Sequence, residues 1–500
     1  MYSVALLREL HDSAACHLIR QDGQEDVLFA VYHPSSGARR FSGLLKQLLF
    51  PEPGDRSVHG NVSFESQYVE RCLREAARIG GGLVLLHSHP GYGWQGMSGD
   101  DIRAEEELAI RAHAVTELPL IGMTIGLDHV WSARVWTKSG RRKFERQMCE
   151  TVRVVGDQLV VSYDEQQRPR PRVGAKQLRT VSAWGEEAQA HLARLRVGLV
   201  GAGSVGMIAG EGVAKSGIED LVVIDYDILE MHNLDRVLFG VEADVLAMRR
   251  KAHILAEGLL LAATTENFQA RPIIASVVEA DGFRAALDCD VLIACVDRPW
   301  ARSALNLIAM AHLIPVIDGG IYIAAKPGGG LRHADWRAHT ISPGRACLEC
   351  LGQFDPGLVS VERDGYLDDP KYIEGLPDDH ILKRRENVFI FSLGCASLQL
   401  MQLLSLIVGP DYSEPGAQTF RYTRSTLESD HSACSPSCYY LTQIGLGDHA
   451  EISPVGFDRA AEKLRDQAET QNLAASDAGH TGWWSDLVAR IVSWSPRRKA

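Results

Sequence analysis

An apolar strand that runs into a glycine-rich turn is the feature that most limits the fold of this chain. Arg196–Val200 (RVGLV) reads as a buried strand, and the sequence GAGSVG follows at once at residues 201–206. A helical pattern at 205–216 and a second apolar strand at 221–224 come next. A strand, a helix and a parallel strand in this order form a βαβ unit. We therefore predict an α/β fold in which this part of the chain is a Rossmann-like domain with a mostly parallel sheet. Further apolar runs that would extend the sheet are Val291–Cys295 and Val316–Ile317.

Length and charge narrow the class of protein. The 500 residues exceed what one hydrophobic core usually organises, so we expect at least two domains. The 64 acidic and 52 basic side chains give a formal net charge of -12, the wrong sign for a surface that neutralises nucleic-acid phosphates. We therefore expect no nucleic-acid partner. The N-terminal residues lack a basic segment that leads into an apolar stretch, so we expect no secretory signal and a cytoplasmic location.

The sequence divides into four parts. Residues 1–163 alternate short apolar runs with helical patterns, which is typical of a compact α/β domain. Residues 164–177 are polar and interrupted by prolines, as expected of a linker. Residues 178–447 form the Rossmann-like domain, and residues 448–500 form a helical tail. Within the tail, the segment Trp483–Trp494 is amphipathic at helical spacing, and we expect it to dock on the protein's own core.

One uncharged segment is about long enough to cross a bilayer. Val388–Val408 carries no charged side chain. Gln399, Gln402 and several serines interrupt it, and a helix that is apolar nearly all round also suits the interior of a large α/β domain. We predict a buried helix and no membrane span.

Two histidines follow a strand in the first part of the chain. His87 and His89 come directly after an apolar run, and residues two apart on a strand project to the same face. Asp101 lies at the start of the next helical pattern, from which it could complete a set of two histidines and one carboxylate. Three ligands with an open fourth position are the arrangement of a catalytic zinc. The simpler alternative is that Ser98 and Asp101 form a capping box and that the histidines merely end a strand.

The whole pattern His-x-His-Pro followed by Ser-x-x-Asp resembles the signature of the JAB/MPN metalloproteases. Members of that family release ubiquitin-like proteins by hydrolysing the bond at their C-terminal glycine. The resemblance implies that His87, His89 and Asp101 bind zinc and that Ser98 helps to hold the tetrahedral intermediate. Asp100 keeps the commoner distance from His89, but Asp101 preserves the spacing from Ser98, and we choose Asp101.

A zinc hydrolase also needs a base that takes a proton from the attacking water. Family members place a glutamate before an early strand. Glu25 stands in that position, two residues before the apolar run that starts at Val27. Glu65 is the competing candidate.

The glycine-rich turn alone fits a dinucleotide-binding site. Gly201, Gly203 and Gly206 have the fingerprint spacing, and Asp225 ends the next strand, where an acidic residue holds a ribose hydroxyl. An NAD-dependent oxidoreductase is therefore one reading. The many charges after Asp225 fit ATP better, since three phosphates and a magnesium ion need arginine, lysine and aspartate.

The series from Asp225 to Arg236 closely resembles the ThiF/MoeB and ubiquitin-activating enzymes, which adenylate the C-terminal glycine of ubiquitin-like β-grasp proteins. The likeness extends over roughly residues 178–440. The resemblance implies that Asp225 holds the ribose, that Asp227 belongs to the ATP site, and that a strand-end aspartate binds magnesium. The strand-end aspartate is Asp297, and Asn233, Arg236 and Lys251 would contact the phosphates. The residues implied for the ATP site are therefore Asp225, Asp227, Asn233, Arg236, Lys251 and Asp297.

The resemblance also implies a homodimer. Arg179 stands where these enzymes have an arginine that reaches into the partner subunit's site. Arg298 follows Asp297 where the family usually has asparagine or aspartate, so this neighbour differs.

The ten cysteines argue for metal binding rather than for disulfides, because we expect a reducing compartment. Two pairs are typical of a structural zinc held by four thiolates: Cys347, Cys350, Cys434 and Cys438. Many activating enzymes carry a thioester cysteine, and Cys395 is the candidate here. Its surroundings read as core, so a small buried thiol is the alternative. In that case the acyl-adenylate would pass directly to a partner thiol or sulfur donor.

Together these features predict a bifunctional enzyme of a ubiquitin-like modification pathway, with catalytic zinc, structural zinc, ATP and Mg²⁺ as cofactors. Its partners would be a ubiquitin-like β-grasp protein and a conjugating enzyme or sulfur donor. Sulfur-carrier activation for thiocarboxylate-based biosynthesis is the alternative. A non-catalytic scaffold is a third class, although the intact ligand set counts against it.

Overall fold

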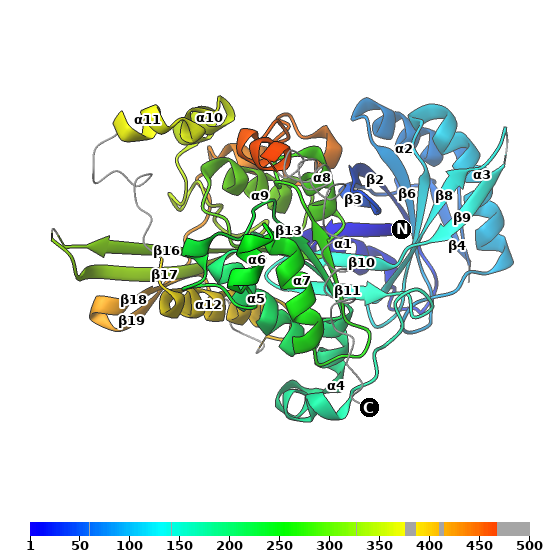
Figure 1. Cartoon of the computed structure of the whole chain (residues 1–500). Helices are drawn as coiled ribbons and strands as arrows, with labels where there is room; N and C mark the ends of the chain where they lie inside the picture. The colour runs from blue at the N-terminus through cyan, green and yellow to red at the C-terminus, as the bar shows by residue number, and fades with distance from the viewer. Residues whose placement is uncertain (60, 142, 327, 376–386, 410–414, 468–500) are drawn as a thin grey trace, which may run out of the picture.

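Two mixed β-sheets, one in each half of the chain, organise the protein. The computed structural model describes residues 1–467 except 60, 142, 327, 376–386 and 410–414. The first sheet has nine strands in the order β11-β10-β1-β3-β2-β6-β7-β8-β9, and the second has eight in the order β14-β13-β12-β15-β16-β17-β18-β19 (Figure 1). The Trp483–Trp494 segment lies outside the described residues.

Helices cover both faces of the N-terminal sheet. Its strands are β1 (Tyr2–Leu7), β2 (Val27–Ser36), β3 (Phe41–Leu49), β6 (Gly82–Ser88), β7 (Leu120–Ile125), β8 (Trp131–Lys138), β9 (Phe144–Met148), β10 (Thr151–Val155) and β11 (Leu159–Tyr163). The apolar core under one face includes residues of α1 (Arg8–Leu18), and the core under the other face includes residues of α2 (Ser66–Arg78) and α3 (Gly99–Thr116). A separate hairpin, β4 (Arg56–His59) and β5 (Asn61–Phe64), completes this half.

The C-terminal sheet begins as a Rossmann-like parallel sheet and continues as antiparallel strands. The parallel strands are β12 (Arg196–Val200), β13 (Asp220–Ile224), β14 (Gln269–Ile273), β15 (Val291–Ala294) and β16 (Val316–Ala325). The antiparallel extension is β17 (Leu331–Ile341), β18 (Ala417–Arg421) and β19 (Thr426–Asp430). The prediction of a Rossmann-like α/β domain is confirmed, and the antiparallel extension is a feature that the sequence did not indicate.

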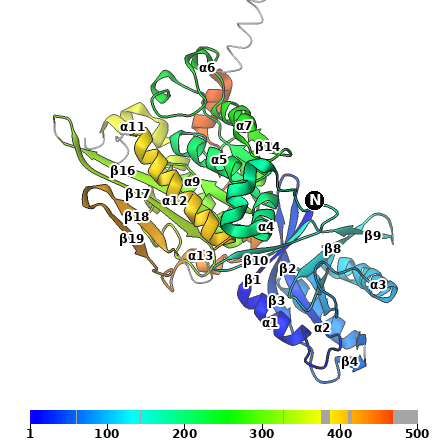
Figure 2. The same ribbon diagram turned by 90° about the horizontal axis from the view of Figure 1, so that it is seen from below.

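Side chains of the parallel strands alternate between two cores. One core contains residues of α5 (Ser204–Lys215), α7 (Lys251–Ala262) and α12 (Phe389–Ile407), and the other contains residues of α8 (Ala280–Leu287) and α9 (Pro299–Ala311). Figure 2 shows α5 and α12 together on the same side of this sheet. Both faces are therefore covered, as parallel sheets require.

Helix α12 corresponds to the uncharged segment. By length and composition it could cross a membrane, and half of its most apolar window is buried inside the protein. Gln399 and Gln402 are buried, and the Gln399 side-chain amide donates to the Ala294 carbonyl oxygen at 2.8 Å. The helix therefore packs across the sheet, which agrees with the predicted core helix. Ile390, Leu393 and Met401 remain exposed along it.

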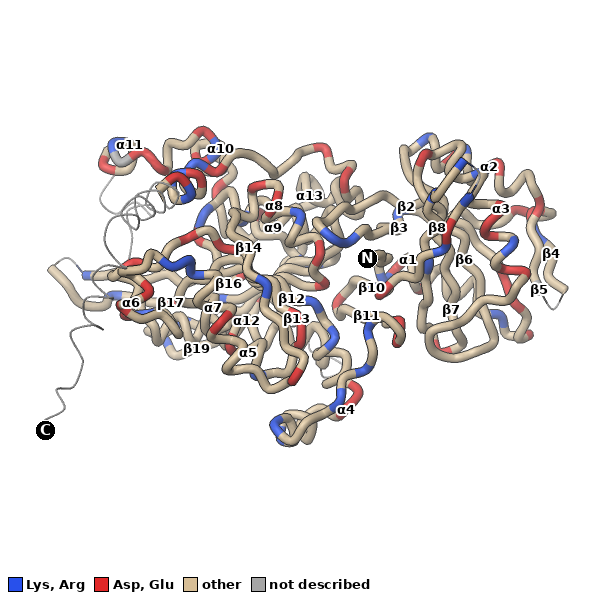
Figure 3. Tube along the Cα trace, turned by 45° about the vertical axis from the view of Figure 1, so that its right-hand side comes forward, with Lys and Arg blue, Asp and Glu red and all other residues tan. Residues whose placement is uncertain are grey.

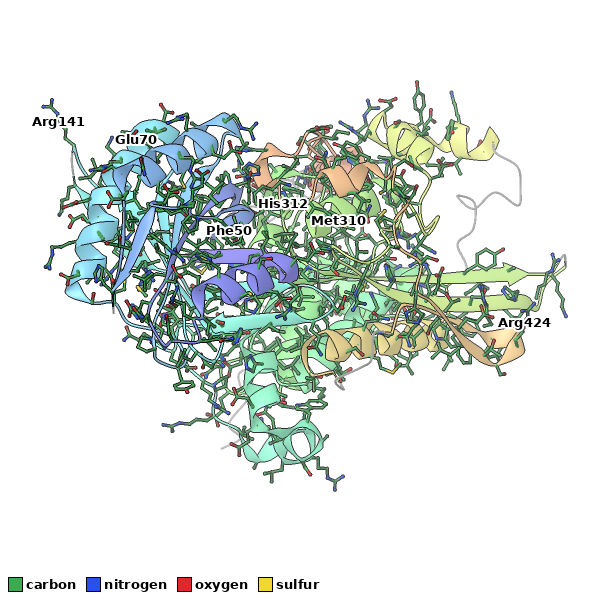
Figure 4. All side chains as sticks on the ribbon, turned by 180° about the vertical axis from the view of Figure 1, so that it is seen from behind. Phe50, Glu70, Arg141, Met310, His312 and Arg424 are labelled. Atoms are coloured by element: carbon green, nitrogen blue, oxygen red, sulfur yellow. The ribbon has the colours of Figure 1, made fainter. Side chains whose placement is uncertain are left out.

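The two halves share one apolar core. Leu44, Val155 and Val161 of the first half belong to the same buried cluster as Leu313 and Leu406 of the second. In Figure 4, His312 lies where the halves meet, and its Nδ1 is 2.8 Å from the Ser35 hydroxyl. Strand β11 ends and α4 (Leu178–Arg194) begins at the two ends of the predicted linker. Acidic and basic side chains are interspersed over both halves (Figure 3).

Candidate functional sites

The first site is a cluster of two imidazoles and a carboxylate at the end of β6. The Nε2 atoms of His87 and His89 are 3.1 Å apart. One oxygen of Asp101 lies 3.4 Å from His89 Nε2, and the other lies 4.0 Å from His87 Nε2. All three ligand atoms lie within 4.8 Å of one another. Two nitrogens and one oxygen that converge in this way fit a zinc ion with an open position.

The start of α3 places Asp101 in this cluster. Ser98 Oγ accepts from the Asp101 amide at 3.1 Å, and the Asp101 carboxylate accepts from the Ser98 amide at 2.8 Å. The capping box and the convergence on the histidines therefore occur together. Asp100 points elsewhere, since it pairs with Arg103 and its side chain is 77% exposed.

Glu25 lies beside the same cluster. It precedes β2, and its carboxylate is 4.0 Å from His89 Nε2. Burial raises the pKa of Glu25; His89 partly offsets this rise, and the Asp101 carboxylate adds to it. Within the described part of the chain, no ion pair joins Glu65 to either histidine, and Glu65 precedes α2. The geometry thus favours Glu25 over Glu65.

A buried ion pair and a hydroxyl group lie beside His87. Arg134 and Glu105 form an ion pair with both side chains at 0% exposure. Arg134 Nη1 donates to Thr124 Oγ1 at 2.6 Å, and that hydroxyl is 3.4 Å from His87 Nε2. Burial, with the Arg134 charge, lowers the pKa of His87 to about 3, so the imidazole is neutral and can ligate a metal.

The second site is the turn between β12 and α5. Gly201 has φ +97°, a conformation that favours glycine, and a Cβ on Gly206 would lie 1.9 Å from the Gly201 carbonyl oxygen. A Cβ on Gly203 would meet nothing within 4 Å. Two glycines are therefore required by the protein's own packing, whereas Gly203 faces open space at the N-terminus of α5, where phosphates bind.

Asp225 closes this turn from the end of β13. Its carboxylate accepts from the Ala202 amide at 2.6 Å and from the Asp227 amide at 2.7 Å. Burial, followed by the Asp227 charge, raises the pKa of Asp225 to about 6. The carboxylate is thus held at the place where a ribose would lie.

The side chains that are predicted to contact the phosphates are each bonded to another group of the protein. Lys251 Nζ is 2.9 Å from Asp227, and Arg236 Nη1 is 2.8 Å from Asp235. Asn233 Oδ1 accepts from the Glu230 amide at 3.1 Å. Burial lowers the pKa of Lys251, but the Asp227 and Asp225 carboxylates outweigh it and raise that pKa. A bound triphosphate would compete with these carboxylates for the cations.

Asp297 and its neighbour Arg298 have different environments. Asp297 is exposed after β15. Arg298 pairs with Asp368 at 2.6 Å and with Glu362 of α10 (Pro356–Arg363) at 3.5 Å. The unusual arginine therefore ties the connection that carries α10 to the edge of the sheet, and it leaves Asp297 accessible.

Arg179 lies in an element other than those of the nucleotide turn. It is exposed in the first turn of α4, a helix that projects from the body of the protein in Figure 1. Among the described residues, no hydrogen bond or ion pair joins Arg179 to the other predicted residues.

The four paired cysteines come together at a third place. Their sulfur atoms lie within 4.8 Å of one another, and the Sγ atoms of Cys347 and Cys438 are 3.7 Å apart. The Cys347 amide donates to Cys434 Sγ at 3.1 Å. Zn–S bonds of about 2.3 Å in a tetrahedron put sulfurs roughly 3.8 Å apart, so these four residues fit a structural zinc.

Cys395 has the environment of a core thiol. It is fully buried in α12, and its sulfur lies 3.5 Å from the Arg337 carbonyl oxygen. Burial raises its pKa to about 12. A nucleophile must be a thiolate that a substrate can reach, so this geometry argues against Cys395 as a thioester cysteine.

The ThiF family matches residues 175–433, which is more than half of the sequence. The chain belongs to the ThiF family. That match contains the glycine turn, the charged residues after Asp225 and the first cysteine pair, Cys347 and Cys350, and it ends just before the second pair, Cys434 and Cys438.

Three relatives illustrate the breadth of the family. The SAMP-activating enzyme E1 of Haloferax volcanii is 29% identical over 168 residues, which cover 33% of this chain and 57% of that protein. The ubiquitin-like modifier-activating enzyme 5 of Drosophila mojavensis is 26% identical and covers 33% of this chain and 41% of that protein. The molybdopterin-synthase adenylyltransferase of Escherichia coli is 24% identical, and the match covers 36% of this chain and 66% of that protein. The chain thus spans only about half the length of the curated relatives that it matches.

Among solved structures, E. coli MccB with ATP matches 54% of this chain and 74% of its own, with 18% identity and a TM-score of 0.42. A structure of MccB with succinimide gives similar values, with 18% identity and a TM-score of 0.41 over 53% and 74%.

Several residues near the sites were not predicted. Thr124 and Arg134 come from strands that only the fold brings to His87. Arg250, which precedes Lys251, is different, because the sequence Arg249-Arg250-Lys251 is an adjacent cluster of cations that could have been noticed.

Proposed function

We propose that the chain is a bifunctional enzyme of a ubiquitin-like modification pathway. Its ThiF half would adenylate the C-terminal carboxylate of a ubiquitin-like protein, and its N-terminal half, a JAB/MPN-type zinc peptidase, would cleave the bond after that C-terminal glycine. The observation that carries the proposal is the convergence of His87, His89, Asp101 and Glu25 in the same chain as the ThiF nucleotide turn. Both chemistries act on one object, an exposed glycine terminus.

In the adenylation site, the amides at the start of α5 and the open space at Gly203 would receive the phosphates of ATP. Asp225 would accept from a ribose hydroxyl. Lys251 and Arg236 would leave their present carboxylates and offset the charge that develops at the α-phosphate when the glycine carboxylate attacks it and pyrophosphate departs. Asn233 would add a neutral contact, and Asp297 would hold Mg²⁺, which neutralises phosphate charge.

Arg179 would act from the partner subunit of a homodimer. Its exposure at the start of α4, away from its own nucleotide turn, supports this role. Two subunits would then each complete the other's site. The physical reason is that the triphosphate carries more negative charge than Lys251 and Arg236 offset together.

The fate of the adenylate follows from Cys395. Because that thiol is buried and its pKa is raised, we propose direct transfer to a partner thiol or sulfur donor. Sulfur-carrier activation, the second candidate function, has the same requirement, and one relative is a molybdopterin-synthase adenylyltransferase.

In the peptidase site, His87, His89 and Asp101 would hold zinc, which acidifies a bound water and polarises the scissile carbonyl. Glu25 would take a proton from the attacking water and return it to the leaving amine. Ser98, at the exposed N-terminus of α3, would donate to the tetrahedral oxyanion.

A single substrate tests both halves. A ubiquitin-like protein encoded near this gene, made with a short extension after its glycine, should lose the extension in a reaction blocked by a zinc chelator. With ATP and hydroxylamine, the product should become a C-terminal hydroxamate that mass spectrometry detects. If the extension is lost but no hydroxamate forms, only the peptidase function is supported. If the extended protein is not cleaved but a pre-trimmed protein forms the hydroxamate, only the activating function is supported. We propose that these reactions take place in the cytoplasm.

A further inference from the structure

A segment beyond the ThiF match lies against the nucleotide site. The match ends at residue 433, whereas residues 454–467 run across loops that follow the parallel strands. Trp300 Nε1, just after β15, donates to the Pro454 carbonyl oxygen at 3.0 Å. The Gly456 amide donates to the Val278 carbonyl oxygen, after β14, at 2.8 Å. The segment therefore contacts the first turn of α9, which follows β15, and the loop after β14.

A third attachment fixes the helical end of this segment. Arg465 donates two hydrogen bonds to the Glu279 carboxylate, at 2.9 and 2.5 Å. Glu279 in turn accepts from the Ser276 amide at 2.9 Å. The guanidinium and carboxylate thus make a two-point contact, which sets orientation as well as position.

Arg250 connects the segment to the residues that would hold the ribose. Its Nη2 donates to the Leu464 carbonyl oxygen at 3.1 Å, and its Nη1 donates to the Tyr226 carbonyl oxygen at 2.7 Å. Tyr226 lies between Asp225 and Asp227 in the sequence. The C-terminal segment therefore orients Arg250, and Arg250 holds the loop that carries both carboxylates.

Apolar packing alone does not account for the segment. Ala461 is its fully buried apolar residue, whereas the Phe457 side chain is 55% exposed. The specific contacts are polar, and they involve the loops after β13 and β14 and the first turn of α9 after β15. In open α/β sheets, ligands bind outside the carboxyl ends of the strands, so these loops border the nucleotide.

We propose that residues 454–465 form an outer wall of the ATP site and that Arg250, oriented by Leu464, is a positioning residue for the ribose-binding loop. The ligand is the adenosine part of ATP. The inference rests on the proposed adenylation function, and it adds a part of the chain that the ThiF match does not contain.

The test is the affinity of the full-length protein for the non-hydrolysable analogue AMPCPP, measured by titration calorimetry. Arg250→Met should raise the Kd at least tenfold. Arg465→Met, which removes the contact of the segment with Glu279 but leaves the Arg250 side chain in place, should raise it at least fivefold. Arg250→Lys should recover part of the loss, because one ammonium can still reach a carbonyl oxygen.

Arg249→Met is the matched control. Arg249 precedes Arg250 but pairs with Asp244 at 2.8 Å and with Glu257 at 2.5 Å, away from the segment. Its Kd should stay within twofold of the parent, and the zinc content and thermal midpoint of all variants should be unchanged. Parent-like binding by Arg465→Met would overturn the proposal, as would parent-like binding by Arg250→Met. Failure of the parent protein to bind AMPCPP would instead contradict the adenylation function itself.

Discussion

Arg40 of the N-terminal half and Asp290 of the C-terminal half form a buried ion pair, with Nη1 2.5 Å from the carboxylate and both side chains 2% exposed. Arg153 approaches the same carboxylate at 3.9 Å. Removal of one partner from a buried pair leaves an uncompensated charge, at a cost of about 3–5 kcal/mol. The pair therefore makes the two halves depend on each other.

We expect the two halves of the protein to unfold together as one cooperative unit. Arg40→Met should lower the free energy of unfolding by about 3 kcal/mol, whereas Arg39→Met, which alters an exposed neighbour, should change it by less than about 0.5 kcal/mol. Calorimetry should show one transition for the parent protein. Two separate transitions, with only one shifted by Arg40→Met, would disprove the shared core.

The two candidate metal sites should load independently. The full chain should contain about two zinc ions, and the double variant His87→Ala, His89→Ala should retain about one, because the four thiolates form a separate site. Atomic absorption on protein purified under reducing conditions measures this. Two zinc ions in the double variant would show that the histidine site does not bind zinc. No zinc in the double variant would show that the four thiolates do not bind it.

Glu25→Gln should separate catalysis from metal binding. The amide keeps the shape of the side chain but cannot take a proton, so cleavage after the C-terminal glycine should fall by about 10²–10⁴-fold. Zinc content should stay at the parental value, since Glu25 is not one of the three clustered ligands. Glu65→Gln is the control and should cleave normally. Full activity of Glu25→Gln would exclude Glu25 as the base.

His11 predicts a pH dependence of stability. Trp131 Nε1 donates to His11 Nδ1 at 2.9 Å, which requires a neutral imidazole, and burial, helped by the Arg8 charge, lowers the pKa of His11 to about 4 from 6.5. In the unfolded chain His11 is therefore protonated below about pH 6.5, whereas in the folded protein it is protonated only below about pH 4. This contribution is complete above pH 6.5 and is lost as the pH falls toward 4, up to about 3 kcal/mol.

The variant His11→Asn keeps an acceptor near the Nδ1 position but does not titrate. Urea unfolding between pH 4.5 and 7.5 should show a shallower decline for His11→Asn than for the parent. Equal slopes for the two proteins would show that His11 does not contribute.

Local sequence patterns made the backbone geometry of the two candidate sites predictable. The glycine turn, the strand before it and the capping box at Ser98 each depend on residues within a few positions, so their spacing alone indicates their geometry. Asp101 lies near the histidines and Asp100 pairs with Arg103, so the choice of Asp101 as the metal ligand stays a prediction that the geometry supports.

Contacts between distant residues were not predictable in the same way. Arg40 and Asp290 are 250 positions apart, and neither stands in a pattern that marks it as buried. The attachment of Arg250 to Leu464 spans 214 positions, beyond the end of the family match. The antiparallel strands β17–β19 likewise depend on pairing partners that the sequence places far apart.

ATP–pyrophosphate exchange measures whether the ThiF half adenylates a protein C-terminus. Labelled pyrophosphate should enter ATP only when a ubiquitin-like protein with a free C-terminal glycine is present. Exchange should be lost in Asp297→Ala and in Arg179→Ala, and part of it should return when the two variants are mixed, because the hybrid dimer contains one site with both residues intact. Absence of exchange with every ubiquitin-like protein encoded near this gene, together with tight NAD binding, would contradict the account.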